Sequence, residues 1–256
     1  MSYIKLNFEN CNYNQCNLLD IAANSSLTIE LKFENIISLQ SRNSTKEHFI
    51  NLIKNELSKF KWIITGRVSV ELVYYINAIE RQETDKIADL DNIAKPLLDS
   101  ITGENGILID DSQIGLLTSE WIPREENINE NIMLIKIDFI NDFTVRKEGL
   151  FFVQYYAAMC IPINLIDFTL FELFSALVLI RCRLKQRKLA EHAKQKDLNL
   201  DFQFVKASYV FHKSRLNKFS RHTILSLNDF KKTCKEHGIT FSSIKSIIKD
   251  MKEQKK

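Results

Sequence analysis

Residues 67–76, RVSVELVYYI, are rich in β-branched and aromatic residues, a composition that predicts a strand. Residues 27–33, LTIELKF, alternate apolar and polar side chains, and this period of two predicts a half-buried strand. Two more strands are predicted over residues 114–122 and 131–140. Residues 44–60 instead space apolar side chains at helical intervals, and Ser44 and Glu47 form an S-x-x-E capping box at the start. The order strand, helix, strand, helix, strand, strand predicts an α+β fold, with helices packed on one small mixed or antiparallel sheet.

The pattern changes after this region, and we expect two domains, residues 1–142 and 143–256. In the second, residues 168–195 predict a long helix whose first half is apolar and whose second half is basic. The stretch LFFVQYYAAMCIPI, residues 150–163, fits either a strand or the start of a buried helix. We therefore expect a mainly helical, basic C-terminal region that follows the α+β domain.

Residues 161–180 are apolar enough to raise the question of a membrane span. Asp167 and Glu172 lie inside this run, and each carboxylate would cost roughly 2.5–3.5 kcal/mol at a bilayer centre, so we expect a buried core helix. The five cysteines are scattered, with neither a CxxC pair nor a zinc spacing, and the N-terminal residues are not a signal peptide. Reduced thiols in a cytoplasmic protein are the expectation.

The net charge of +3 conceals a strong asymmetry. Residues 1–180 hold 15 Lys and Arg against 25 Asp and Glu, a balance of −10. Residues 181–256 hold 20 against 7, a balance of +13. An acidic body with a basic tail is typical of a protein in which one part holds cations and another meets a polyanion such as DNA. The alternative is a solvated basic face.

The C-terminal stretch contains a candidate helix-turn-helix. A first helix would end at Gly238, and Ser242 or Ser243 would cap a second helix. The second helix would carry an apolar face and three lysines on its other faces, Lys245, Lys249 and Lys252. These lysines would contact DNA if the second helix enters a major groove. The alternative is a plain helical hairpin that covers the core.

Residues 89–114, DLDNIAKPLLDSITGENGILIDDSQI, contain five aspartates: Asp89, Asp91, Asp99, Asp110 and Asp111. A helix follows the first pair, so Asp91 or Asn92 is expected at its N-cap and Pro96 in its first turn. A cap explains one aspartate. It does not explain two acidic residues that are two positions apart and a second acidic pair about 20 residues later, because neighbouring carboxylates destabilise one another unless a cation is present.

A hard divalent cation would resolve this repulsion. Mg²⁺ prefers oxygen ligands and keeps several waters, so two or three carboxylates suit it. No cysteine or histidine lies nearby in the sequence, which argues against zinc. Lys95 follows Asp91 by four residues and returns to the same helix face, where it could neutralise surplus charge or stabilise charge on a phosphate.

The motif D-L-D-N-x-x-K, followed by T-G and then D-D-S-Q-I, resembles the RusA-type Holliday-junction resolvases, tightly over residues 89–114 and loosely over about 25–140. The resemblance implies a homodimeric, Mg²⁺-dependent endonuclease that acts on four-way DNA junctions through a metal-activated water. One or two Mg²⁺ ions per site are implied, with Mn²⁺ able to substitute. The family's metal-binding catalytic carboxylates and essential lysine correspond to Asp89, Asp91, Asp111 and Lys95. Asp110 would be an auxiliary metal ligand and Asp99 structural.

Two family features differ here. The early proline-rich loop is absent from residues 34–43, and the basic run before the first motif is reduced to Lys86. A less structure-selective DNA nuclease is therefore one alternative, and a non-catalytic DNA-binding protein on the same scaffold is another. A haloacid-dehalogenase D-x-D motif is discounted because polar residues precede it, and a calcium loop because its alternating ligands are missing.

Overall fold

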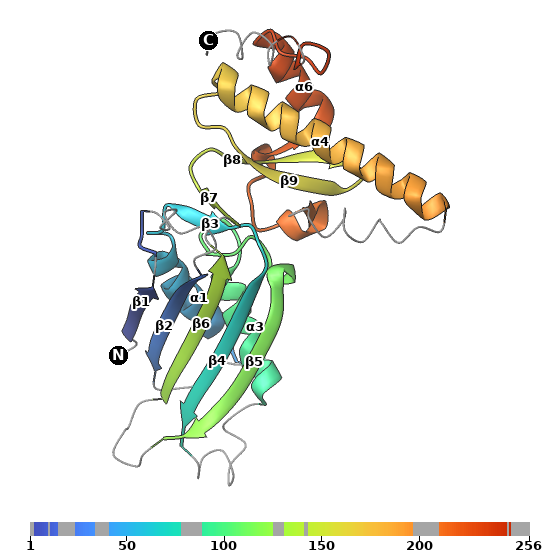
Figure 1. Ribbon diagram of the computed structural model, residues 1–256. Helices are drawn as coiled ribbons and strands as arrows, with labels where there is room; N and C mark the ends of the chain where they lie inside the picture. The colour runs from blue at the N-terminus through green and yellow to red at the C-terminus, as the bar shows by residue number, and fades with distance from the viewer. Residues whose placement is uncertain are drawn as a thin grey trace. The chain divides into compact units, whose positions relative to one another are not determined.

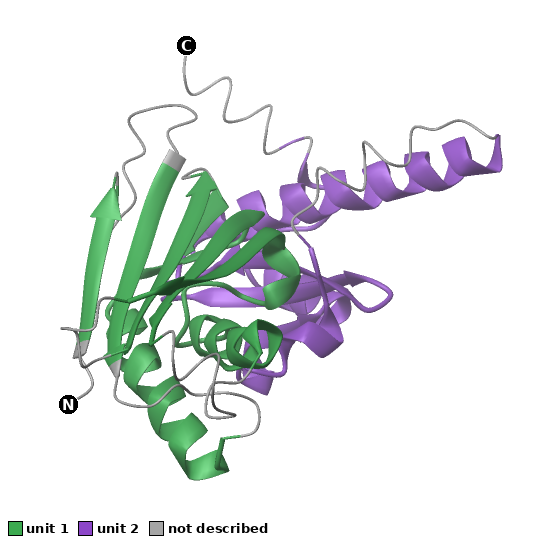
Figure 2. Cartoon of the chain, turned by 90° about the horizontal axis from the view of Figure 1, so that it is seen from below, with its two compact units in different colours: residues 1–145 green, residues 146–256 purple. Residues whose placement is uncertain are grey.

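The computed structural model describes residues 3–9, 11–14, 24–33, 41–77, 89–124, 131–140, 143–196, 210–244 and 246. The chain forms two compact units, Met1–Val145 (unit 1) and Arg146–Lys256 (unit 2), which Figure 2 shows in different colours. The roles expected for the two parts of the chain, a nuclease domain and a DNA-binding region, stay predictions.

Unit 1 is built on a five-stranded mixed sheet in the order β1-β2-β6-β4-β5 (Figure 1). The strands are β1 (Tyr3–Glu9), β2 (Asn24–Phe33), β4 (Val68–Ile76), β5 (Ile114–Pro123) and β6 (Asn131–Ile140). Neighbouring strands are antiparallel except β4 and β5, which are parallel. Four of these strands were predicted from the sequence, whereas β1 was not. A short pair, β3 (Trp62–Ile64) and β7 (Thr144–Arg146), completes the strands of this part.

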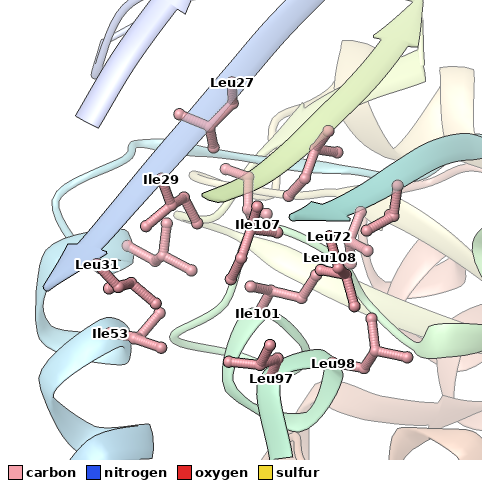
Figure 3. Packing of buried hydrophobic residues seen from close by; sticks show 14 of the residues in the cluster. Leu27, Ile29, Leu31, Ile53, Leu72, Leu97, Leu98, Ile101, Ile107 and Leu108 are labelled. Carbon is pink, nitrogen blue, oxygen red and sulfur yellow. The ribbon is translucent and has the colours of Figure 1, made fainter. Parts of the chain in front are cut away.

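Two helices, α1 (Asn43–Leu57) and α3 (Leu90–Ile101), pack together and supply the apolar side chains that complete the core of unit 1. Figure 3 shows how side chains from β2, β4 and both helices converge. Members of this cluster include Leu27, Ile29, Leu31, Ile53, Leu72, Leu97, Ile101 and Leu108. Burying such a side chain stabilises the folded chain by roughly 1.5–3 kcal/mol relative to leaving it exposed. The α+β prediction for this part is confirmed, since two helices pack on a mixed sheet.

The start of α1 differs from the prediction. The helix begins at Asn43 with Arg42 at the N-cap position, and no described side chain caps it. Ser44 is therefore the second helical residue, and the predicted capping box with Glu47 is wrong. Packing of Phe49, Ile53 and Leu57 against the sheet stabilises this helix instead.

Unit 2 is not mainly helical, and that prediction is wrong. It contains a four-stranded sheet in the order β10-β9-β8-β11, together with helices α4 (Leu170–Gln195) and α6 (Leu227–Glu236). The strands are β8 (Leu150–Tyr156), β9 (Met159–Asn164), β10 (Phe211–His212) and β11 (Ile224–Ser226). The ambiguous stretch 150–163 is a β-hairpin. Its turn contains Ala157 at a positive φ of 44°, and it lacks the glycine or asparagine that normally signals such a turn.

The apolar run over residues 161–180 is divided between β9 and the start of α4. Glu172 in this run closes a capping box with Thr169: each side chain accepts a hydrogen bond from the other residue's backbone N–H. Hydrogen bonds from the backbone N–H groups of Thr169 and Ile166 lower the pKa of the Glu172 carboxyl. Among the residues that the structure describes, no helix is both long and apolar enough to cross a membrane.

Lys147, in the turn before β8, carries a testable electrostatic cost. Burial lowers the pKa of its amine from 10.5 to about 8. Below that pH both the folded and unfolded chains are protonated, and the full cost of burying the ammonium is present. Between about 8 and 10.5 the unfolded state binds more protons, so stability rises with pH until the cost is gone.

We therefore expect Lys147→Met to raise the free energy of unfolding at neutral pH by about 1–2 kcal/mol. The gain should disappear above pH 10.5. Urea denaturation of both proteins across this range, followed by circular dichroism, measures the effect. A gain that does not change with pH would show that packing, not ionisation, is responsible.

Candidate active site

The first acidic pair lies at the start of α3. Asp89 occupies the N-cap position with an extended backbone, and its carboxylate makes no capping hydrogen bond to the helix. Asp91 is in the first turn and is exposed. The helix thus begins earlier than expected: neither Asp91 nor Asn92 is the cap, and Pro96 lies in the second turn. The Asp89 carboxylate is therefore not used to cap the first backbone N–H groups of α3.

A tight loop brings the chain back from α3 to the second acidic pair. Ile107 and Leu108 both donate backbone hydrogen bonds to the carbonyl of Ile101, at 2.9 and 3.0 Å. Gly103 adopts a positive φ of 95°, and a Cβ on Gly106 would lie 2.4 Å from the Ile101 carbonyl oxygen. Glycine is therefore required at both positions. The T-G-x-x-G sequence is what places the second pair beside the helix.

Gln113 fixes the loop that carries the second pair. Its side chain is 6% exposed and makes four hydrogen bonds. Its Oε1 accepts from the backbone N–H groups of Ile109 and Asp110, at 2.7 and 3.0 Å. Its Nε2 donates to the carbonyls of Ile64 and Gly66, at 2.9 and 2.8 Å. The amide thereby ties the acidic loop to the end of β3, a role that no pattern in the sequence indicated.

Lys95 joins the helix to this loop. Its Nζ lies 3.1 Å from Oδ2 of Asp111 and 3.4 Å from Oδ1 of Asp99. Asp91, Lys95 and Asp99 are four residues apart along α3 and share one face. Because Lys95 reaches Asp111, this face is directed toward the acidic loop. The structure thus brings Lys95 and Asp111 together, and it also gives Asp99 a partner.

The electrostatics at Lys95 follow from these contacts. Partial burial is the largest influence and lowers the pKa of its amine, but the hydrogen bond to Asp111 and the charge of Asp99 together raise the pKa above its ordinary value. Lys95 therefore carries its positive charge throughout the neutral range. Its side chain is 45% exposed, so the ion pairs contribute little to stability and leave the ammonium accessible.

Asp110 is used within the loop itself. Its side chain accepts a hydrogen bond from Ser112 N at 3.1 Å and caps the short 3₁₀ turn Asp111–Gln113. A second cation lies near the start of β5: Arg67 is exposed and donates from Nη2 to the Gly115 carbonyl at 2.9 Å. A Cβ on Gly115 would lie 1.6 Å from the Arg67 Nε, so this glycine makes room for the guanidinium. No pattern in the sequence signalled this pair.

Whether these residues suit a divalent cation depends on donor chemistry and placement. The donors at the site are carboxylate oxygens, which are the ligands that Mg²⁺ prefers. Within the described ranges, however, no three His, Cys, Asp or Glu side chains are grouped so that they could hold one ion. The donor set fits Mg²⁺, and the Lys95 ammonium lies beside one of these donors, Asp111.

The predicted DNA-contacting lysines, Lys245, Lys249 and Lys252, lie outside the described residues, as do Lys86 and most of the loop at residues 34–43. Of the candidate helix-turn-helix, α6 and the turn at Gly238 (φ 75°) are described. In the turn that follows, Thr240 Oγ1 accepts a hydrogen bond from Ser243 N at 3.2 Å. Helical backbone begins at Ile244, directly after Ser243. The contact of this element with DNA stays a prediction.

Fold and site together define an α+β domain in which a carboxylate and lysine cluster lies between a helix and the loop that follows it. The family model described as "Endodeoxyribonuclease RusA" matches residues 38–132. Residues 38–132 are thus a RusA endodeoxyribonuclease family domain, which confirms the resemblance, and the C-terminal region remains unassigned. No curated protein matches the chain.

Proposed function

We propose that this protein is a Mg²⁺-dependent endodeoxyribonuclease that cleaves branched DNA such as Holliday junctions. Membership of residues 38–132 in the RusA family suggests a crossover-junction endonuclease with DNA as its substrate. The observation that carries the proposal is the contact between Lys95 and Asp111. It joins the two halves of the motif, 16 residues apart in sequence, at one site.

In this proposal Asp89, Asp91 and Asp111 hold the ion, with Asp110 as an auxiliary ligand. Mg²⁺ held there would supply Lewis acidity, which acidifies water and stabilises charge on a phosphate. Lys95 remains protonated and offsets negative charge that develops on the scissile phosphate. Gln113 holds the acidic loop in place, and one part of the basic C-terminal region supplies affinity for the DNA backbone.

We also propose a homodimer, because two sites related by a two-fold axis would match the symmetry of a four-way junction. An edge strand supports this proposal. β5 is at the edge of the five-stranded sheet, and it exposes 60% of Leu116 and 44% of Leu117. Unpaired strand edges with exposed apolar residues are surfaces that another chain can cover.

The substrate class is tested with labelled four-way junction, linear duplex and single-stranded DNA, each incubated with Mg²⁺, with Mn²⁺ or with EDTA. We expect paired, symmetric nicks on the junction that require the divalent ion. Cleavage of every substrate would keep the nuclease chemistry and discard junction selectivity. Binding without cleavage of any substrate would exclude the nuclease.

A second candidate is a non-catalytic DNA-binding protein built on a RusA-family scaffold. The observation that favours it is that the carboxylates are not gathered into a metal-binding group within the described part of the chain. All four residues of the family's site are nevertheless present, Asp89, Asp91, Lys95 and Asp111, and this favours the enzyme.

A further inference from the structure

One short stretch of unit 2 carries several positive charges on a strand and two turns of defined conformation. Residues 211–223, FHKSRLNKFSRHT, which we call the basic segment, contain four Lys and Arg and no Asp or Glu. The cations are Lys213, Arg215, Lys218 and Arg221. The segment includes β10, two 3₁₀ turns (Lys213–Leu216 and Arg221–Thr223) and the chain between them.

Buried apolar side chains hold the basic segment against the sheet of unit 2. Phe211, Leu216 and Phe219 are 4%, 1% and 8% exposed. The ring of Phe219 meets that of Phe152 on β8 edge to face, with centroids 4.9 Å apart. Lys213 N donates to the Ala158 carbonyl in the β8–β9 turn at 2.7 Å. The apolar residues and the cations are interspersed along the segment. Burial of the apolar side chains against the sheet therefore leaves the cations on the outer side.

The basic segment and the helices lie on opposite faces of this sheet. Val153 and Tyr155 of β8 belong to the core cluster that includes residues of α4 and α6. Their neighbours Phe152 and Gln154 point to the other face, because alternate residues of a strand do so. Phe152 contacts Phe219, and Gln154 Oε1 accepts from Lys213 Nζ at 3.1 Å. In Figure 1 the orange turn at residues 213–216 accordingly lies on the side of β8 and β9 away from α4.

Local hydrogen bonds fix the conformation of the turns. His212 Nδ1 lies 2.7 Å from Ser214 Oγ, and Ser220 Oγ lies 2.8 Å from His222 Nδ1. Thr223 Oγ1 donates to the Ser220 carbonyl at 2.7 Å. Lys213, Arg215 and Arg221 are exposed on this ordered backbone. Because the backbone is already ordered, binding a ligand at these cations would cost little conformational entropy.

We propose that the basic segment is a binding surface for the phosphodiester backbone of double-stranded DNA. Lys, Arg and Ser side chains with backbone N–H groups are the donors that contact DNA phosphates. An anionic membrane surface fits less well, because membrane-binding segments present apolar side chains outward and here all three are buried. The choice of DNA as the polyanion rests on the proposed function, whereas the surface itself rests on the geometry of unit 2.

The test measures how binding depends on salt. Fluorescence anisotropy with a labelled duplex, in EDTA and over about 50–300 mM KCl, gives the slope of log K against log salt. Each phosphate contact contributes about 0.9 to this slope, so the double variant Arg215→Gln, Arg221→Gln should reduce it by about 1.8 and weaken binding roughly tenfold near 150 mM. Arg215→Lys with Arg221→Lys should retain most of the slope, because a point charge suffices at a phosphate.

A matched control removes the same charge from the other face. Lys185 and Lys188 are exposed on α4, and Lys185→Gln with Lys188→Gln should leave the slope unchanged. If the two glutamine pairs reduce the slope equally, binding follows net charge and the proposal is overturned. Binding to anionic phospholipid vesicles but not to duplex DNA would also overturn it.

Because the measurement is made without divalent ions, it is separate from catalysis. A protein that cleaves no DNA but shows the expected change in slope would lose its proposed nuclease function and keep this surface. A protein that cleaves junctions while the Arg215 and Arg221 variant binds like the wild type would keep its function and lose this surface.

Discussion

Asp91→Asn should cleave a four-way DNA junction roughly a thousandfold more slowly than the wild type in the presence of Mg²⁺. The substitution keeps the size of the side chain and removes the negative charge through which Asp91 is proposed to hold the ion. Asp91 is exposed and lies at the start of α3, so the free energy of unfolding should change by less than about 0.5 kcal/mol. Single-turnover cleavage of a labelled junction measures the rate, and urea denaturation measures the stability.

The chain offers a matched control on the same helix. Asp99→Asn removes the same charge two turns further along, from a carboxylate that pairs with Lys95 at 3.4 Å and is interpreted as structural. We expect this variant to retain cleavage within about threefold, since Lys95 keeps its hydrogen bond to Asp111. Equal losses in the two variants would show that general charge around Lys95 matters and that Asp91 has no specific role. Wild-type activity in Asp91→Asn would remove it from the site.

Gln113→Leu is expected to lower the free energy of unfolding of unit 1 by about 3 kcal/mol and to weaken cleavage as well. The leucine fills a similar volume but offers no partner to two buried N–H groups and two carbonyls. Each such group costs about 1–3 kcal/mol when it is left unsatisfied, and local relaxation recovers part of the sum. Both tryptophans, Trp62 and Trp121, lie in unit 1, so tryptophan fluorescence during urea denaturation follows the correct unit.

Ser112→Ala is the control for this prediction, because Ser112 is the exposed neighbour of Gln113 and the hydrogen bond it makes to Asp110 is from its backbone. Its stability should change by less than about 0.5 kcal/mol. If Gln113→Leu were as stable as the wild type, the four hydrogen bonds would contribute nothing net. If it were destabilised but cleaved DNA normally well below its unfolding transition, the position of the acidic loop would not depend on Gln113.

These two predictions separate chemistry from positioning. The Asp91 substitution should change the rate with little change in stability, while the Gln113 substitution should change both. Lys95 lies between the two residues in the structure, on the helix of Asp91 and against the loop that Gln113 holds. A loss of activity can therefore be assigned to the ion-holding carboxylates or to the loop by comparing, for each variant, the change in cleavage rate with the change in the free energy of unfolding.

Much of unit 1 could be predicted from local sequence. The strands at residues 67–76 and 131–140 follow a period of two that a half-buried strand imposes on its own residues. The acidic motif could be recognised for a similar reason, since its aspartates, lysine and glycines occupy 26 consecutive residues, 89–114. Helix starts were less reliable: α1 and α3 both begin earlier than the capping patterns indicated, because packing against the sheet outweighs a single cap.

Local sequence is enough to predict which segments form strands and amphipathic helices and which side chains can carry metal and phosphate chemistry, since these properties are encoded within a few neighbouring residues. Three features depend on the folded chain: Lys95 meets Asp111, Gln113 reaches the carbonyls of Ile64 and Gly66, and residues 150–163 form a hairpin whose two faces are covered differently. The contacts of Lys95 and Gln113 join residues 16 to 49 positions apart, and no local periodicity records them. They form because the burial of apolar faces brings distant segments of the chain together. Polar side chains that become buried where these segments meet must then form hydrogen bonds with one another or with the backbone.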